Sequence, residues 1–150
     1  MATVEYFAEI GRTMAQDHMK NWSQFSGRRQ QVHAAMGLVL DYEKDLTSHL
    51  IDGLLEIDGL TIQGISDKDA LDRRVPTVSF THDSVAPDDI AKSLAGQNIF
   101  VWSGDFYAVD AAKTLGVHDT GGTLRVGPVH YNSIEEVDEL LKALRALLCG

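Results

Sequence analysis

A long apolar stripe with the period of an α-helix constrains the fold of this chain more than any other feature. Apolar residues recur at steps of three, four and seven between Gln31 and Ile57, which places them on one face of a long helix. They are Val32, Met36, Val39, Leu46, Leu50, Leu54 and Ile57. The Asp58-Gly59 pair predicts a left-handed turn that ends this helix. We therefore expect a long helical segment in the first part of the chain.

The other elements also follow from the hydrophobic period. We expect a first helix over residues 3–14 with Gly11 as its stop, and a polar connector over residues 15–29. After Gly59 the apolar residues alternate as in half-buried strands, and the segments are 60–65, 75–80, 98–102 and 123–127. Three more helices are predicted: one that begins at Pro87, one over 106–115, and one that follows a capping box at Ser133 and Glu136.

This order predicts an α+β fold. We expect a small mixed or antiparallel sheet of about four strands, covered by helices and preceded by the long N-terminal helical segment. Two long helices are more than one small sheet needs, which suggests that the chain is part of something larger.

Composition excludes several classes of protein. The 150 residues are 44% hydrophobic and 23% charged, as in an ordinary globular domain. A net charge of −9 repels phosphate backbones, so we expect no nucleic-acid partner. No apolar run is long enough to span a membrane, and the first residues do not resemble a signal peptide. The single cysteine, Cys149, excludes an internal disulfide and favours the reducing cytoplasm.

Most candidate catalytic patterns are incomplete. The two His-Asp pairs, His82-Asp83 and His118-Asp119, lack the further ligands that a metal phosphohydrolase needs, so we expect no metal site. The chain has no GxSxG nucleophile elbow. Gly121-Gly122 is too short for a phosphate loop and precedes a strand.

Arg125 is the best candidate for a binding residue. It lies in the middle of an alternating strand, where an arginine must face solvent, a carboxylate partner or a ligand. One interpretation is an exposed or salt-bridged arginine of the sheet surface. The other is a bidentate clamp for a substrate carboxylate, which the planar guanidinium fits well.

Three segments, residues 74–80, 98–108 and 124–138, together resemble the C-terminal domain of class V aminotransferases. More narrowly, the chain is similar to the cysteine desulfurase-like branch of these fold-type-I pyridoxal-phosphate enzymes. Residues 4–11 and the long helix are similar to the part that joins the two domains there. The resemblance implies that residues 1–29 are the interdomain segment and that residues 30–150 are the small, substrate-gripping domain.

The resemblance also implies roles for individual residues. Arg125 matches the arginine that grips the α-carboxylate of an amino-acid substrate. Tyr107 stands at about the place of the sulfur-accepting cysteine of cysteine desulfurases, which argues against sulfur transfer. Tyr107 either lines the substrate pocket or packs at a helix start. The Schiff-base lysine and the groups that hold the cofactor belong to the large domain, upstream of Met1.

We therefore expect pyridoxal phosphate in the parent enzyme, none bound to this chain, and no catalysis by the chain alone. The expected partners are its own large domain and a second copy in a homodimer, with contacts centred on residues 3–25. Two alternatives stay open from the residues alone. One is an amino-acid-binding regulatory module with a ferredoxin-like or ACT-like sheet, in which Arg125 clamps a free amino acid. The other is a purely structural or interaction domain.

Overall fold

A computed structural model describes residues 1–149 of the chain. They form two compact units, of which the first is Met1–Glu43 and the second begins at Lys44. Helix α3 (Gly27–Leu55) contributes residues to both units.

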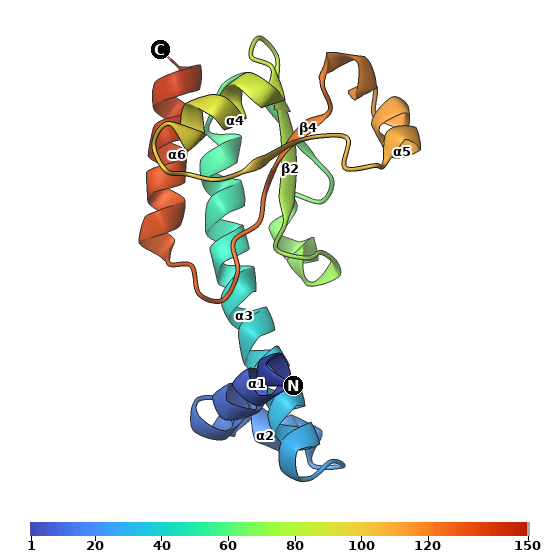
Figure 1. Cartoon of the computed structure of the whole chain (residues 1–150), viewed down its shortest axis with the longest axis vertical. Coiled ribbons are helices and arrows are strands. Elements are labelled where there is room, and N and C mark those ends of the chain that lie inside the picture. The colour runs from blue at the N-terminus through green and yellow to red at the C-terminus, as the bar shows by residue number, and fades with distance from the viewer. Residues whose placement is uncertain (150) are drawn as a thin grey trace. The chain divides into compact units, whose positions relative to one another are not determined.

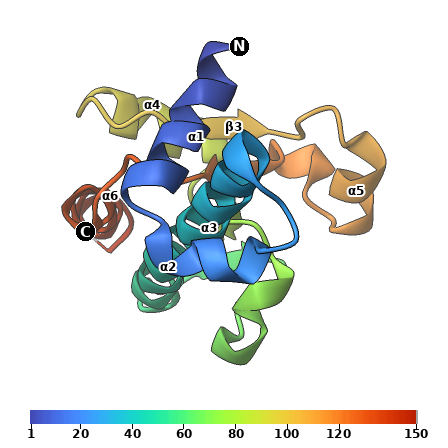
Figure 2. The same cartoon turned by 90° about the horizontal axis from the view of Figure 1, so that it is seen from below.

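The first unit is helical. It contains α1 (Ala2–Thr13), the short α2 (Gln16–Met19), a 3-10 turn at Lys20–Trp22 and the first turns of α3 (Figure 2). Helix α1 ends at Thr13, close to the predicted end at residue 14, so Gly11, a candidate stop in the sequence, lies inside the helix. Gly11 is buried, and a Cβ there would lie 1.9 Å from the carbonyl oxygen of Gln31. The glycine therefore permits the close approach of α1 to α3.

The connector between α1 and α3 is more ordered than the sequence predicts. It contains α2 and the 3-10 turn, and α3 begins at Gly27 instead of Gln31. The His33 ring stacks on Trp22 at 4.5 Å and on Phe25 at 4.7 Å between ring centroids. The aromatic residues of the connector thus pack on the first turns of α3.

The second unit is built on a four-stranded antiparallel sheet. Its strands are β1 (Leu60–Gln63), β2 (Val78–His82), β3 (Trp102–Gly104) and β4 (Thr123–Val126), in the order β1-β2-β4-β3. All three neighbouring pairs are antiparallel. This confirms the α+β class, the number of strands and the long helix that precedes the sheet.

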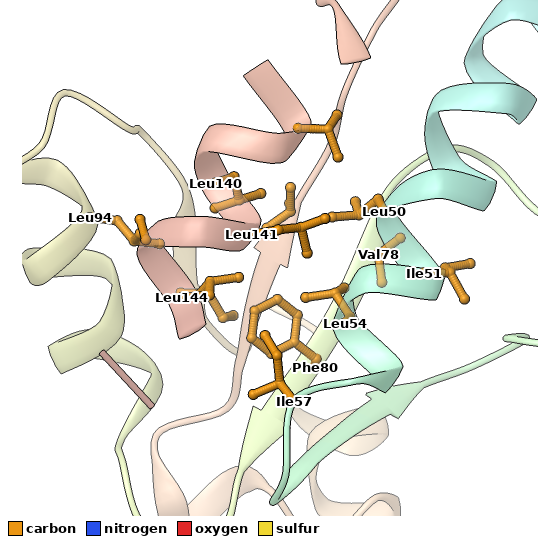
Figure 3. Packing of buried hydrophobic residues seen from close by; sticks show 14 of the residues in the cluster. Leu50, Ile51, Leu54, Ile57, Val78, Phe80, Leu94, Leu140, Leu141 and Leu144 are labelled. Atoms are coloured by element: carbon orange, nitrogen blue, oxygen red, sulfur yellow. The ribbon is translucent and has the colours of Figure 1, made fainter. Parts of the chain in front are cut away.

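Helices cover one face of this sheet. They are the second part of α3, α4 (Pro87–Ala95) and α6 (Ile134–Leu148), and Figure 1 shows them on the same side of β2 and β4. Phe80 of β2 is fully buried and points into the core among Leu54, Ile57 and Leu144 (Figure 3). Short helices lie outside this layer: α5 (Val109–Thr114) and the 3-10 turns Lys68–Arg73 and His118–Thr120.

The two longest helices of the second unit pack closely. A Cβ at Gly53 of α3 would lie 2.2 Å from Cδ1 of Leu141 in α6. Polar contacts flank this approach: His49 Nε2 lies 2.6 Å from Asp138 Oδ1, and Arg145 Nη2 lies 2.8 Å from Glu56 Oε2. The capping box predicted at the start of α6 is present.

Some predicted bounds differ from the structure. The segment predicted as a strand over 98–102 pairs only from Trp102 onward, as β3. The strand predicted over 75–80 begins at Val78, and the helix predicted over 106–115 begins at Val109. Among residues 1–149, no helix is both long enough and apolar enough to cross a membrane.

Candidate functional site

Arg125 lies in the middle of β4 with its side chain exposed. Its neighbours in the strand, Leu124 and Val126, are buried in the core under the helices. Because side chains alternate along a strand, Arg125 points to the opposite, open face of the sheet. In register, Arg125 lies opposite Ser79 of β2 and Trp102 of β3, whose side chains share this face.

The Arg125 guanidinium packs on an aromatic ring. Its Cζ atom lies 4.1 Å from the centroid of the Phe106 ring, which is cation–π geometry. Within residues 1–149 no carboxylate forms an ion pair with Arg125. The guanidinium is therefore oriented but not neutralised, and its hydrogen-bond donors are available for a ligand.

Phe106 belongs to an unusual loop that follows β3. Phe106 and Tyr107 both have left-handed backbone conformations, with φ of 54° and 63°. Such conformations cost free energy in residues other than glycine, so the surrounding structure must hold them. The Tyr107 backbone N–H donates to Asp105 Oδ1 at 3.0 Å, which closes a turn around Phe106.

The start of β4 supports this loop. Gly122 has a φ of 82°, and a Cβ there would lie 2.2 Å from the carbonyl carbon of Gly104. His118 adds a contact at the same place, because its Nδ1 atom lies 3.9 Å from Asp105 Oδ2. The loop that carries Phe106 is thus held against the segment that leads into Arg125.

Tyr107 is fully exposed, with 101% of its reference surface accessible. It precedes α5, so the interpretation as a residue packed at a helix start does not hold. Tyr107 is the chain neighbour of Phe106, which contacts Arg125. The structure therefore places the two candidates from the sequence, Arg125 and Tyr107, around one loop.

Sequence reasoning missed Phe106 as a functional residue. The hydrophobic pattern places Phe106 in the first turn of the helix predicted over 106–115, where a phenylalanine is expected to pack in the core. The one local signal is Gly104-Asp105, since glycine followed by aspartate is typical of turns. The contact with Arg125 joins the loop after β3 to strand β4, and it was not visible in the chain order.

Arg74, the other arginine in the segments 74–80 and 124–138, has a structural role. Its guanidinium donates hydrogen bonds to the carbonyl oxygens of Ile65, of Val75 at 3.1 Å and of Thr77 at 2.7 Å. Burial lowers the pKa of Arg74 from its ordinary value, because desolvation disfavours the charged form. Arg74 therefore fastens the loop before β2.

The other titratable side chains of residues 1–149 lie apart from Arg125 or in pairs. No group of three or more metal-ligating side chains occurs within residues 1–149. His82 Nε2 lies 3.2 Å from the carbonyl oxygen of Asp58, and His118 faces Asp105, so neither predicted His-Asp pair acts as a pair. A separate hollow of about 340 Å³ lies between residues 98–101 and the start of α6, with Glu136 and Glu139 on its rim.

The chain's own residues do not fit pyridoxal phosphate. Its six lysines are Lys20, Lys44, Lys68, Lys92, Lys113 and Lys142, and all six are exposed. Lys68 and Lys92 also form ion pairs with Asp52 and Asp88, both at 2.7 Å. A Schiff-base lysine needs a desolvated pocket that lowers its pKa, and no lysine here has one.

The chain is similar to known proteins of one family. The family described as "Aminotransferase class-V" matches residues 32–140. The aminotransferase-like protein FGM3 of Gibberella zeae is 32% identical over 112 residues, which cover 73% of this chain and 27% of that protein. A probable cysteine desulfurase of Staphylococcus epidermidis is 34% identical over 104 residues, which cover 69% of this chain and 24% of that protein.

A solved structure shows the same arrangement of elements. The apo cysteine desulfurase of Thermococcus onnurineus NA1 superposes with a TM-score of 0.69 and 27% identity, over 83% of this chain and 31% of that chain. The chain thus spans about a quarter to a third of the length of the relatives that it matches.

Proposed function

The chain belongs to the class V aminotransferase family, and we propose that it is the small domain that grips the substrate carboxylate in a pyridoxal-phosphate enzyme. The proposed enzyme is a transferase or lyase that acts on an amino acid. In this proposal, residues 1–29 are the segment that joins the small domain to the large one. The large domain supplies about the two thirds of the relatives' length that this chain does not span.

The carboxylate clamp is Arg125. The observation that carries this proposal is the un-neutralised guanidinium on the open face of the sheet, oriented by Phe106. A guanidinium donates two parallel hydrogen bonds to a carboxylate, which fixes the orientation of the substrate as well as its charge. The guanidinium lies over the Phe106 ring, and no carboxylate of residues 1–149 forms an ion pair with it, so its charge is available to the ligand.

The cofactor belongs to the rest of the enzyme. Pyridoxal phosphate supplies the electron sink when it is bound, and the protein's task is to position it and the substrate. Since all six lysines here are exposed, the Schiff-base lysine comes from the large domain. The contribution of this chain is to bind and orient the substrate through Arg125.

Tyr107, in place of a sulfur-accepting cysteine, argues against sulfur transfer by this enzyme. A phenol cannot accept a sulfur atom as a cysteine thiolate does, and the only cysteine of the chain, Cys149, lies at the end of α6. We therefore propose that Tyr107 lines the substrate site and that the enzyme is not a desulfurase. A reducing, cytoplasmic location fits the single unpaired cysteine. The alternative of an amino-acid-binding regulatory module is not favoured, because the family match covers residues 32–140.

The test is a carboxylate titration of the chain followed by NMR. Sodium propionate should shift the Nε–H resonance of Arg125 and the backbone amide resonances of β4 around it, while sodium chloride at the same ionic strength should not. The Arg125→Gln variant should abolish the saturable response of those backbone amides. Arg73→Gln is the matched control, since it removes the same charge from an exposed side chain elsewhere. A response of equal size in Arg125→Gln would contradict the proposal.

A further inference from the structure

We propose that Phe106 is the positioning residue for Arg125, so that the loop 104–107 and the carboxylate clamp work as one preorganised unit. This inference rests on the proposed function, in which Arg125 binds the substrate carboxylate. It adds that the conformation of the clamp is set before the substrate arrives, by an aromatic ring that sequence reasoning did not single out.

The contact itself is specific in geometry. The Arg125 Cζ atom lies 4.1 Å from the Phe106 ring centroid, which is well within the range of a cation–π interaction. On the sheet surface, Arg125 is flanked by its cross-strand partners Ser79 and Trp102. The Arg125 side chain therefore starts between two neighbours on the sheet surface, and the Phe106 ring packs on its guanidinium.

The position of Phe106 is determined by its neighbours. Asp105 accepts the Tyr107 backbone N–H at 3.0 Å and holds the turn in which Phe106 has a φ of 54°. Gly122 leaves space for the backbone of Gly104, which a Cβ would approach to 2.2 Å. A left-handed backbone conformation costs free energy in phenylalanine. It places the Phe106 ring against the Arg125 guanidinium.

The same turn keeps the nearest loop carboxylate away from Arg125. Asp105 Oδ1 accepts the Tyr107 N–H, and Asp105 Oδ2 lies 3.9 Å from His118 Nδ1. Asp105 forms no ion pair with Arg125 within residues 1–149. Phe106 thus orients the cation while Asp105 is turned elsewhere, which leaves the positive charge for a carboxylate ligand.

Preorganisation predicts a measurable effect on binding. A free arginine side chain loses much rotamer freedom when it binds, and a side chain already held by a ring loses less. Loss of an exposed cation–π contact corresponds to a weakening of binding of about two- to fivefold. A phenylalanine that only covers apolar surface would not change the affinity of Arg125 for a carboxylate.

The experiment compares the chain with Phe106→Leu and Phe106→Tyr. Both variants place a residue other than glycine at the same left-handed backbone position, so the backbone strain is the same in the two. Only tyrosine keeps an aromatic ring. In the unmodified chain, the Arg125 δ-protons and Nε–H should be shifted upfield by the ring current of Phe106. Arg125→Gln identifies these resonances by their loss.

We expect Phe106→Leu to abolish the upfield shift and to weaken propionate binding by about two- to fivefold, whereas Phe106→Tyr retains both. Absence of the upfield shift in the unmodified chain would overturn the inference without any variant, so a misfolded Phe106→Leu does not prevent a decision. Unchanged propionate affinity in a folded Phe106→Leu would also overturn it. If the ring-current shift is present but no carboxylate binds at Arg125, the proposed function fails, and the positioning role fails with it.

Discussion

Gly122 and Gly104 lie in backbone contact, so that a Cβ on Gly122 would come within 2.2 Å of the Gly104 carbonyl carbon. Gly122 also has a φ of 82°. Because of the left-handed φ and the close backbone contact, a residue with a side chain at position 122 would force the loop that carries Phe106 to shift. The start of β4 and the loop after β3 are thus held together by the absence of a side chain.

Gly122→Ala should therefore destabilise the chain strongly. The left-handed conformation costs about 1–2 kcal/mol in alanine, and overlap with the backbone adds about 1–3 kcal/mol. Gly116→Ala is the matched control, because Gly116 has a similar φ of 72° but nothing within 4 Å of its Cβ position. Urea unfolding should show a clearly larger loss for Gly122→Ala, and equal losses would contradict the close approach.

The loss of folding stability at low pH should depend on the capping box at the start of α6. Hydrogen bonds from the Ser133 backbone and from Asn132 hold the pKa of Glu136 below its ordinary value. A lowered pKa in the folded state contributes stability above the pKa of the unfolded chain, and this contribution is lost as the pH falls through the folded pKa. Glu136→Gln should thus be less stable than the unmodified chain at neutral pH, and the gap should narrow as the pH falls through the lowered pKa of Glu136.

Urea unfolding at several pH values measures this gap. Glutamine at this position can still cap the helix, so the comparison isolates the charge. Glu139→Gln, one turn further along α6, is the control for removal of a carboxylate outside the capping box. A gap for Glu136→Gln that stays constant with pH would show that the carboxylate does not stabilise the folded state through its charge.

Pyridoxal phosphate should bind to this chain only weakly and without a preferred lysine. The reason is that each of the six lysines is exposed, so that its amine is strongly hydrated and has no desolvated pocket around it. A spectral titration should show a shallow, non-saturating rise in imine absorbance. One saturable site, lost on substitution of a single lysine such as Lys113, would contradict this expectation.

Sulfide release should be slow in any enzyme that contains this domain with Tyr107 in place of a cysteine. Turnover of free cysteine to alanine, with its sulfur passed on as sulfane sulfur, should be negligible beside transamination or lyase activity on the preferred amino acid. The measurement is alanine formation by the whole enzyme, with dithiothreitol present to reduce the sulfane sulfur to sulfide, and with Tyr107→Cys as the comparison. Comparable rates of sulfide release and of the other reaction would show that Tyr107 does not occupy the sulfur-acceptor position.

Self-association should involve residues 3–25. Val4 and Tyr6 are each 48% exposed and Met14 is 70% exposed, although Trp22 and Phe25 are partly covered by their stacking with His33. Burial of roughly 400 Å² of apolar surface per chain would contribute on the order of 10 kcal/mol before the entropy of association. We therefore predict a homodimer by light scattering at micromolar concentration.

Val4→Ser should weaken that dimer. Val75→Ser is the matched control, because Val75 is 68% exposed and lies in the second unit. A strict monomer at high micromolar concentration, with residues 1–25 resistant to protease, would defeat the prediction. A dimer that Val4→Ser leaves as tight as in the unmodified chain would place the interface away from Val4 and contradict the prediction.

The sequence by itself determined those features that depend on local pattern. The stripe of α6, the capping box at Ser133 and Glu136, and the helix that begins at Pro87 all follow from residues a few positions apart. The outward direction of Arg125 follows from alternation along one strand, because Leu124 and Val126 need burial. Such features require no knowledge of what lies across the fold.

Tertiary structure alone decided the features that depend on distant partners. The segment 98–102 has the pattern of a strand, but only Trp102 has a partner there, because β4 offers Thr123–Arg125 to residues 102–104. Gly11 has the character of a helix stop in the sequence, but in the fold it is the position where the backbone of Gln31 lies against α1. Phe106 contacts Arg125 only because Asp105 and Gly122 hold its loop beside β4, which brings its ring to the Arg125 guanidinium. Strand register and close backbone approach are set by contacts across the fold, and no local pattern of residues encodes them.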